Sequence, residues 1–248
     1  MLTEERHSII LKLVNRQGSV KINELCIALD TSESTIRRDL NILAEHGLIN
    51  KVHGGAIALN ENFFRYEDDI AKKSHLFIEE KTAVAKYASS LIEDGDYIYI
   101  DAGTTTEKII DYIPSKNVTF VTNAFMNAKK LSQHGFRVFV PAGEIKSTTE
   151  AIVGAECVIS LQNYNFTKCF LGVNGISISG GLSTPDKNEA IVKSTVIQHS
   201  KEVYILADHS KFDQITSVRF AGLNCGKIIT DKLSDKKYLS EASIKEVL

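Results

Sequence analysis

With 248 residues, the chain is long enough to bury the cores of one or two domains. Its 43% hydrophobic and 24% charged residues are typical of a globular protein, and no apolar run approaches the roughly 18 residues that span a bilayer, so we expect no membrane segment. The net charge of −2 does not indicate nucleic-acid binding, so any affinity for DNA must come from where the charges lie.

The first residues of the chain, its cysteines and its histidines exclude further classes of function. Glu4, Glu5 and Arg6 stand where a secretory signal would need an apolar stretch, so we expect a cytoplasmic protein. The four cysteines are far apart, and neither they nor the histidines show metal-ligand or catalytic-triad spacing. We therefore expect reduced thiols, no metal site and no cofactor.

The first 30 residues predict two helices. The first begins near Thr3 and ends at residues 17–18, and a short strand follows at residues 19–21. The apolar positions of both helices recur at helical spacing: Ile10, Leu13 and Val14 in the first, and Ile22, Leu25, Cys26 and Leu29 in the second. Two short helices of this kind are typical of the start of a helix-turn-helix domain.

A third helix is predicted after Thr31 or Ser32, either of which can cap it. Ile36, Leu40 and Leu43 form its core face, while Ser34, Arg38 and Asn41 lie opposite, with Arg37 at the margin. Arginine can bind guanine and asparagine can bind adenine through paired hydrogen bonds in a major groove. Gly47 ends the helix, and residues 48–53 predict a strand of a wing. The expected DNA contacts are Ser32, Ser34, Thr35, Arg37, Arg38, Asn41, Lys51 and His53.

The simpler alternative is a small three-helix bundle whose arginines are merely solvated. Residues 34–40, with Leu43, Gly47 and the run Val52-His53-Gly54-Gly55-Ala56, decide between the two. Together they resemble the amino-terminal domain of the DeoR family of bacterial transcriptional regulators. The resemblance implies a winged helix-turn-helix DNA-binding domain over residues 1–57.

Residues 58–80 are polar and mixed, and we interpret them as a linker followed by a docking helix. From residue 81 to residue 248, short apolar runs alternate with helical segments, which predicts an α/β domain with a parallel sheet covered on both faces. The predicted strands are residues 97–100, 118–121, 138–140, 169–173, 203–207 and 228–229, with helices at 124–133 and 189–199.

Polar residues follow several of these strands, at the edge where open α/β sheets bind ligands. Asp101-Ala102-Gly103-Thr104-Thr105-Thr106 stands out, because its glycine, hydroxyls and the free amides of a helix expected to start near Glu107 can hold a phosphate. For any single one of these residues, a role as a helix cap or turn former is about equally plausible.

Residues 170–176, 181–186 and 207–212 also resemble the DeoR family, in its carboxy-terminal sensor domain. That domain is Rossmann-like and similar in fold to ribose-5-phosphate isomerase, and the resemblance implies a phosphorylated sugar as effector. The expected effector contacts are Asp101, Gly103, Thr104, Thr105, Thr106, Asn123, Asn174, Glu189 and Lys211.

The sequence therefore predicts a homo-oligomer, dimer or tetramer, that binds a double-stranded DNA operator and represses a sugar-utilisation operon. Within the family, the start of the chain and residues 101–106 and 183–186 are similar to fructose operon repressors, which implies fructose 1-phosphate as effector. The alternative is a sugar-phosphate isomerase with an added helical domain. The related isomerases carry an acid-rich segment where this chain has Gly172-Val173-Asn174-Gly175, so we expect no enzymatic activity.

Overall fold

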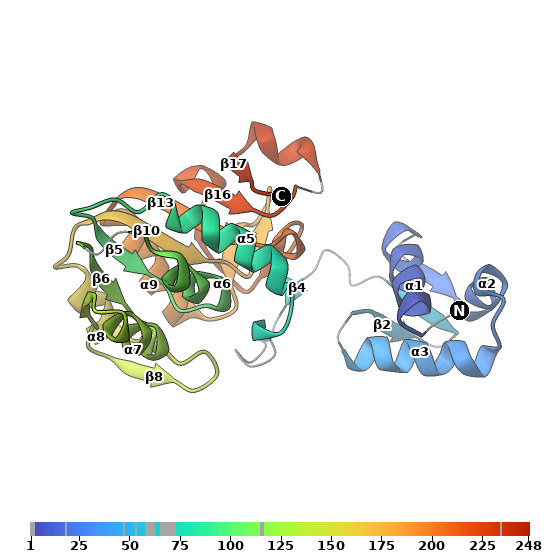
Figure 1. The fold of residues 1–248 in the computed structure, drawn as a ribbon. Helices are drawn as coiled ribbons and strands as arrows, with labels where there is room; N and C mark the ends of the chain where they lie inside the picture. The colour runs from blue at the N-terminus through green and yellow to red at the C-terminus, as the bar shows by residue number, and fades with distance from the viewer. Residues whose placement is uncertain are drawn as a thin grey trace. The chain divides into compact units, whose positions relative to one another are not determined.

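The computed structural model describes residues 3–17, 19–46, 48–52, 54–57, 63–64, 73–114, 117–233 and 235–248 (Figure 1). The chain divides into two compact units, Met1–Phe63 and Phe64–Leu248. Most of the expected linker, residues 58–62 and 65–72, lies outside the described residues. None of the helices in the described ranges has the length and hydropathy that crossing a bilayer requires.

The first unit is a winged helix-turn-helix, as predicted. Its helices and strands follow in the order α1 (Thr3–Gln17), β1 (Ser19–Lys21), α2 (Ile22–Leu29), α3 (Glu33–Glu45), β2 (Asn50–Val52) and β3 (Gly55–Ile57). The strands form one antiparallel sheet in the order β1-β3-β2. The strand expected over residues 48–53 is shorter than predicted, because residues 48 and 49 form a bend that leads into β2.

The three helices bury their predicted apolar faces in a single core. Ile10 and Val14 of α1, Leu25 of α2, and Ile36 and Leu40 of α3 are all fully buried. Burial of such side chains stabilises a fold by about 1.5–3 kcal/mol each. The helical periodicity of the sequence therefore fixes which face of α3 packs inward and which remains exposed.

An ion pair that the sequence does not reveal locks α3 against α1. Asp39 lies on the inner side of α3 and is 2% exposed. Arg6 donates hydrogen bonds to its two carboxylate oxygens at 2.5 and 2.9 Å, and His7 Nε2 lies 3.0 Å from Oδ1. Burial alone would raise the pKa of Asp39, but the hydrogen bonds from Arg6 and His7 outweigh it and hold the pKa below its usual value.

The second unit contains a seven-stranded sheet in which every neighbouring pair is parallel. From edge to edge, the strands are β17 (Ser243–Glu246), β16 (Lys227–Thr230), β13 (Ser200–Ala207), β10 (Phe166–Gly172), β5 (Tyr97–Ile100), β6 (Thr119–Thr122) and β7 (Arg137–Phe139). The parallel α/β architecture predicted from strand-helix alternation is confirmed.

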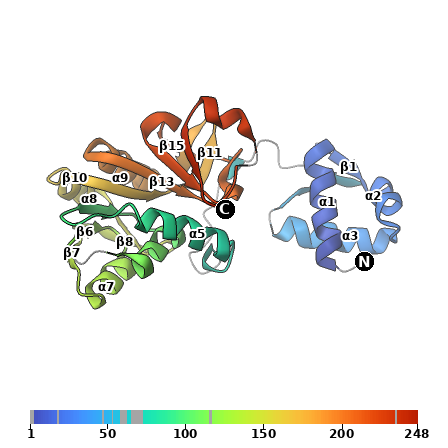
Figure 2. The same ribbon diagram turned by 45° about the horizontal axis from the view of Figure 1, so that its top comes forward.

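Helices cover both faces of this sheet (Figures 1 and 2). Alternate residues of one strand enter opposite cores: Ile98 and Ile100 pack on the side of α5 (Ile78–Ser89) and α7 (Phe125–Gln133), and Tyr99 on the side of α8 (Ala155–Leu161) and α9 (Lys187–Gln198). The alternation of side chains along an extended strand explains this division.

Several elements were not predicted. They are the edge strand β17, the hairpin β8 (Glu144–Lys146) and β9 (Ala151–Val153), and a small sheet of β11 (Gly175–Ser177), β12 (Gly181–Thr184) and β15 (Val218–Ala221). Each is only three or four residues long, which is too short for an apolar periodicity to be recognised in the sequence.

The remaining short elements are β4 (Phe63–Phe64), α6 (Thr104–Glu107), β14 (Ile215–Thr216) and the 3-10 helices η2 (Lys108–Tyr112), η3 (His209–Lys211), η4 (Leu223–Cys225) and η5 (Lys236–Ser240).

We predict that Asp39→Ala lowers the free energy of unfolding of the first unit by about 2–3 kcal/mol, because it leaves the partly buried Arg6 without its partner. Urea unfolding followed by circular dichroism checks this. Glu33→Ala is the control on the same helix: it removes the Glu33–Arg37 ion pair, in which both side chains are more than half exposed, and should cost less than about 0.5 kcal/mol. Equal losses for the two variants would contradict the proposed role of Asp39.

Candidate functional site

The exposed face of α3 begins at a hydrogen-bonded cap. Ser32 Oγ accepts a hydrogen bond from the main-chain amide of Thr35 at 3.4 Å, which identifies Ser32, rather than Thr31, as the cap. The Ser32 hydroxyl also lies 3.0 Å from that of Ser34 and 2.9 Å from that of Thr35. These three predicted DNA contacts therefore form one hydroxyl cluster at the start of the helix.

The long polar side chains of α3 point away from its core. Arg37 pairs with Glu33 one turn earlier, with Nε 2.9 Å from Oε1. Lys51 of β2 donates a hydrogen bond to Asn41 Oδ1 at 2.5 Å, which joins the wing to the helix. Arg38 is exposed, and the described residues contain no ion pair for it. His53, the remaining predicted contact, lies outside the described residues.

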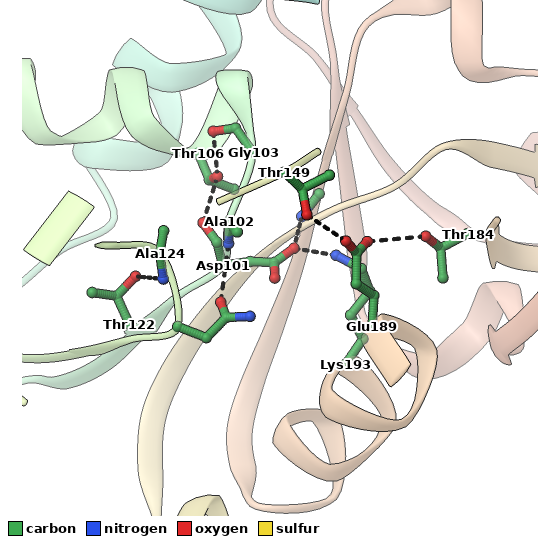
Figure 3. A network of polar contacts seen from close by, with 12 residues as sticks. Asp101, Ala102, Gly103, Thr106, Thr122, Ala124, Thr149, Thr184, Glu189 and Lys193 are labelled. Atoms are coloured by element: carbon green, nitrogen blue, oxygen red, sulfur yellow. Dashed lines mark hydrogen bonds and ion pairs between the residues drawn. The ribbon is translucent and has the colours of Figure 1, made fainter. Parts of the chain in front are cut away.

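In the second unit, the loop after β5 is fixed from several sides. The helix that follows begins at Thr104, three residues earlier than predicted, so the threonines form its first turn. Thr106 Oγ1 donates to the main-chain oxygens of Asp101 and Gly103, at 2.8 and 2.9 Å (Figure 3). Asn123 Oδ1, at the end of β6, accepts a hydrogen bond from the Ala102 amide at 3.1 Å. The loop is thereby held in one shape before any ligand arrives.

A buried network of charges lies beside this loop (Figure 3). Lys193 of α9 forms an ion pair with Asp101 Oδ2, which also accepts a hydrogen bond from the Gly172 amide at 3.0 Å. Burial raises the pKa of Asp101, and the adjacent Lys193 ammonium opposes that shift. The pair ties together the ends of β5 and β10 and the middle of α9.

Glu189, one turn before Lys193, belongs to the same network. Its Oε1 atom accepts hydrogen bonds from Thr149 at 2.7 Å and from Lys146 at 3.0 Å, and its Oε2 atom lies 3.4 Å from the Thr184 hydroxyl. Lys146 and Thr149 come from β8 and the turn that follows it. Glu189 therefore anchors the β8–β9 hairpin at the edge of the site.

A pocket opens at the carboxyl ends of the central strands, where the sequence placed the site. Seven of the nine predicted effector residues line it: Gly103, Thr104, Thr105, Thr106, Asn174, Glu189 and Lys211. Asp101 and Asn123 do not line it. Both are buried, and they hold the loop through Lys193, Gly172 and Ala102.

Three lysines that were not among the predicted effector contacts, Lys73, Lys81 and Lys193, also line this pocket beside the predicted Lys211. Lys81 lies on α5, is 4% exposed and donates a hydrogen bond to the main-chain oxygen of Lys73. Burial lowers the pKa of Lys81 to about 8, against the attraction of Asp208 and with the repulsion of nearby lysines. No local pattern marks these lysines, because the fold brings α5 and α9 to the loop from distant parts of the chain.

The composition of the pocket suits an anionic, hydroxyl-rich ligand. Several lysine ammonium groups and the hydroxyls of Thr104 and Thr105 surround a helix start whose first amides have no partner within the helix. Such amides and cations bind phosphate groups, and Asn174 and Glu189 add the polar atoms that hydrogen-bond hydroxyl groups.

Comparison with known protein families agrees with both units. Residues 6–62 match the family described as the DeoR-like helix-turn-helix domain, and residues 76–232 match the DeoR C-terminal sensor domain. The chain is 40% identical to the transcriptional regulator FruR of Bacillus subtilis, itself described as uncharacterized, over 100% of this chain and 99% of the relative. It is 36% identical to the lactose phosphotransferase system repressor of Staphylococcus epidermidis, over 98% of each chain.

Among solved structures, ribose 5-phosphate isomerase A from Methanocaldococcus jannaschii matches 53% of this chain and 53% of its own, with 19% identity and a TM-score of 0.40.

We predict that the pocket loses affinity for a phosphate ester as the pH rises through the pKa of Lys81. A phosphate dianion keeps its charge between pH 7 and pH 9, because its second pKa is about 6. The protonated fraction of Lys81 falls about tenfold over that range, so the Kd for a phosphate ester should rise about tenfold. Isothermal titration calorimetry across that range measures the change.

Lys81→Arg provides the control for this pH dependence, because guanidinium keeps its charge throughout the range. This variant should bind the same phosphate ester with nearly the same Kd at pH 7 and pH 9. A tenfold loss that persists in Lys81→Arg would show that another group titrates.

Proposed function

This chain belongs to the DeoR family of transcriptional regulators, and from that premise we propose that it represses a sugar-utilisation operon under the control of a phosphorylated sugar. It has the family's helix-turn-helix domain and sensor domain, so it is a DNA-binding regulator. Beyond family membership, we propose that the protein acts as a repressor, that its effector is a phosphorylated sugar and that it is located in the cytoplasm. The observation that carries it is the lysine-rich pocket around residues 103–106.

For DNA binding, we propose that α3 lies in the major groove, with its N-terminal cap and its exposed face toward the DNA. Arg38 and Asn41 are the side chains that can read base edges, whereas Ser32, Ser34 and Thr35 can bind phosphates at the start of the helix. Lys51 of the wing would lie near the sugar-phosphate backbone, and His53, the next residue after β2 in the sequence, is a further proposed contact. A homo-oligomer, dimer or tetramer, would place such helices on repeated half-sites.

For the effector, we propose that the phosphate group binds at the first turn of α6, between Thr104, Thr105, Lys81 and Lys211. The sugar hydroxyls would then face Asn174 and Glu189 on the other side of the pocket. Fructose 1-phosphate is our choice of effector, on the likeness of residues 101–106 and 183–186 to fructose operon repressors and on the relative named FruR. The relatives named lactose phosphotransferase system repressors support a sugar as the regulating signal.

Release of repression requires that the effector favour an arrangement that binds DNA less well. A coupling free energy of about 1–3 kcal/mol changes DNA affinity roughly 5- to 150-fold, which is sufficient for a switch. Lys73 and Lys81 line the pocket and also lie on the part of the second unit that comes first along the chain. A phosphate bound between these lysines would therefore contact the part of the second unit that follows the DNA-binding unit in the sequence.

We propose binding without turnover for this pocket. An isomerase needs a carboxylate that is free to take a proton next to a carbonyl. Both acids considered for that role are engaged: Asp101 pairs with Lys193, and Glu189 accepts hydrogen bonds from Lys146 and Thr149. These contacts leave neither carboxylate free to take a proton from a substrate.

We predict that Arg38→Ala weakens operator binding by about tenfold or more, because a paired arginine–guanine contact is worth about 1–3 kcal/mol. Fluorescence anisotropy with DNA from upstream of the gene, at fixed salt, measures the loss. Affinity for fructose 1-phosphate should stay unchanged in the same variant. Lys12→Ala, which removes an exposed charge from α1, is the matched control and should bind the operator nearly as wild type does. If Arg38→Ala binds like Lys12→Ala, Arg38 makes no base contact.

Thr105→Val should have the reverse effect. The substitution keeps the shape of the side chain and removes one hydroxyl that can donate to the phosphate, so affinity for fructose 1-phosphate should fall roughly 10-fold or more. Operator binding should remain, and the sugar should no longer release it at concentrations that release wild type. Thr119→Val on β6, which does not line the pocket, serves as control. Normal release of Thr105→Val would move the phosphate site elsewhere.

A further inference from the structure

A cluster of three side chains beside the pocket has no part in the proposed function. It consists of Glu80 on α5, His209 at the end of β13 and Asp231 at the end of β16. One ligand atom from each residue lies within 4.8 Å of the other two. The sequence does not predict this cluster, because Glu80 lies more than 100 residues before His209, and Asp231 lies 22 residues after it.

The charges of the cluster are unbalanced. Asp231 is fully buried, and among the described residues its carboxylate contacts His209 and the Thr230 hydroxyl but forms no ion pair with lysine or arginine. Glu80 adds a second carboxylate within reach. When the imidazole is neutral, this buried carboxylate has no cationic partner among the described residues, and a bound cation would offset the cost of its burial.

The neighbouring groups hold the cluster in a fixed orientation. The main-chain amide of His209 donates to Asp231 Oδ1 at 2.6 Å, and His209 Nδ1 lies 2.7 Å from Asp231 Oδ2. The ring of Phe77 packs edge-on against the imidazole, with ring centroids 5.2 Å apart. The His209 side chain is still 23% exposed, so an ion can reach the cluster from solvent.

We propose that Glu80, His209 and Asp231 form a binding site for a divalent transition metal, with Zn²⁺ as the ion that fits best. One imidazole nitrogen and two carboxylate oxygens are donors that zinc accepts, and the imidazole disfavours Mg²⁺ and Ca²⁺. Three protein ligands leave a fourth position open for water or an anion.

Binding requires only a small rearrangement. Zinc bonds of about 2.0–2.1 Å place tetrahedral ligand atoms about 3.3 Å apart, so the contact between His209 Nδ1 and Asp231 Oδ2 must widen by about 0.6 Å. The imidazole Nδ1 then carries the metal, and the ring proton resides on Nε2. Rotation of the partly exposed His209 ring and of Glu80 accommodates this change.

The cluster lies next to the pocket along α5 and along the segment that joins β13 to η3. Lys81 follows Glu80, Asp208 precedes His209, and Lys211 lies two residues further on; all three line the pocket. A metal bound to Glu80 and His209 would fix the positions from which Lys81 and Lys211 extend. Metal binding is therefore expected to change the affinity of the pocket for a phosphorylated ligand.

The experiment is a zinc titration of the full-length, chelator-treated protein by isothermal titration calorimetry. We expect one saturable Zn²⁺ per chain, with Mg²⁺ binding at least tenfold weaker. Glu80→Gln and His209→Gln should each weaken zinc binding tenfold or more. Glu79→Gln removes an exposed carboxylate from the same turn of α5 and should leave it unchanged.

Circular dichroism of each variant establishes that it folds, and the partly exposed Glu80 is the substitution least able to disturb the fold. The absence of saturable zinc binding by the wild-type protein would overturn the proposal. So would a zinc affinity that both Glu80→Gln and His209→Gln leave unchanged, since the ion would then bind elsewhere. Neither result would overturn the proposed operator and phosphosugar binding, which are measured separately in the metal-free protein.

Discussion

The buried ion pair between Asp101 and Lys193 is the interaction on which the sensor unit depends. It joins the end of β5 to α9, and the Gly172 amide adds the end of β10 to the same carboxylate. Removal of one partner from a buried pair typically costs about 3–5 kcal/mol, because the other charge is left unpaired. The same contacts set the position of the loop over residues 102–106, so the stability of the sheet and the shape of the pocket have a common origin.

In the DNA-binding unit too, the positions of the charged side chains matter. Residues 1–57 hold seven basic and seven acidic residues, yet these charges are not equally exposed. Asp39 is buried and contacts Arg6 and His7, and Glu33 pairs with Arg37. Arg38 therefore remains exposed on the outer face of α3. The position of each charge, rather than the sum, determines what the helix presents to DNA.

The sequence predicts the local features of this structure better than the contacts between distant residues. The helix faces of the first unit and the strand at residues 97–100 follow from spacing and from apolar period, and the structure confirms their places, whereas the helix after that strand starts at Thr104, three residues earlier than predicted. Lys81 was missed because its neighbours in sequence give no reason for it to meet Thr105. Short edge elements such as β17 are stabilised by pairing with β16, and their own composition does not predict them.

The central claim is that one chain couples a DNA-reading helix to a phosphosugar pocket. The most direct test is the affinity of the wild-type protein for DNA from upstream of its own gene, measured by fluorescence anisotropy at fixed salt with and without fructose 1-phosphate. The account predicts specific binding that the sugar weakens by roughly 5- to 150-fold. Specific binding that neither fructose 1-phosphate nor any other phosphosugar alters, or the absence of specific binding, would contradict it.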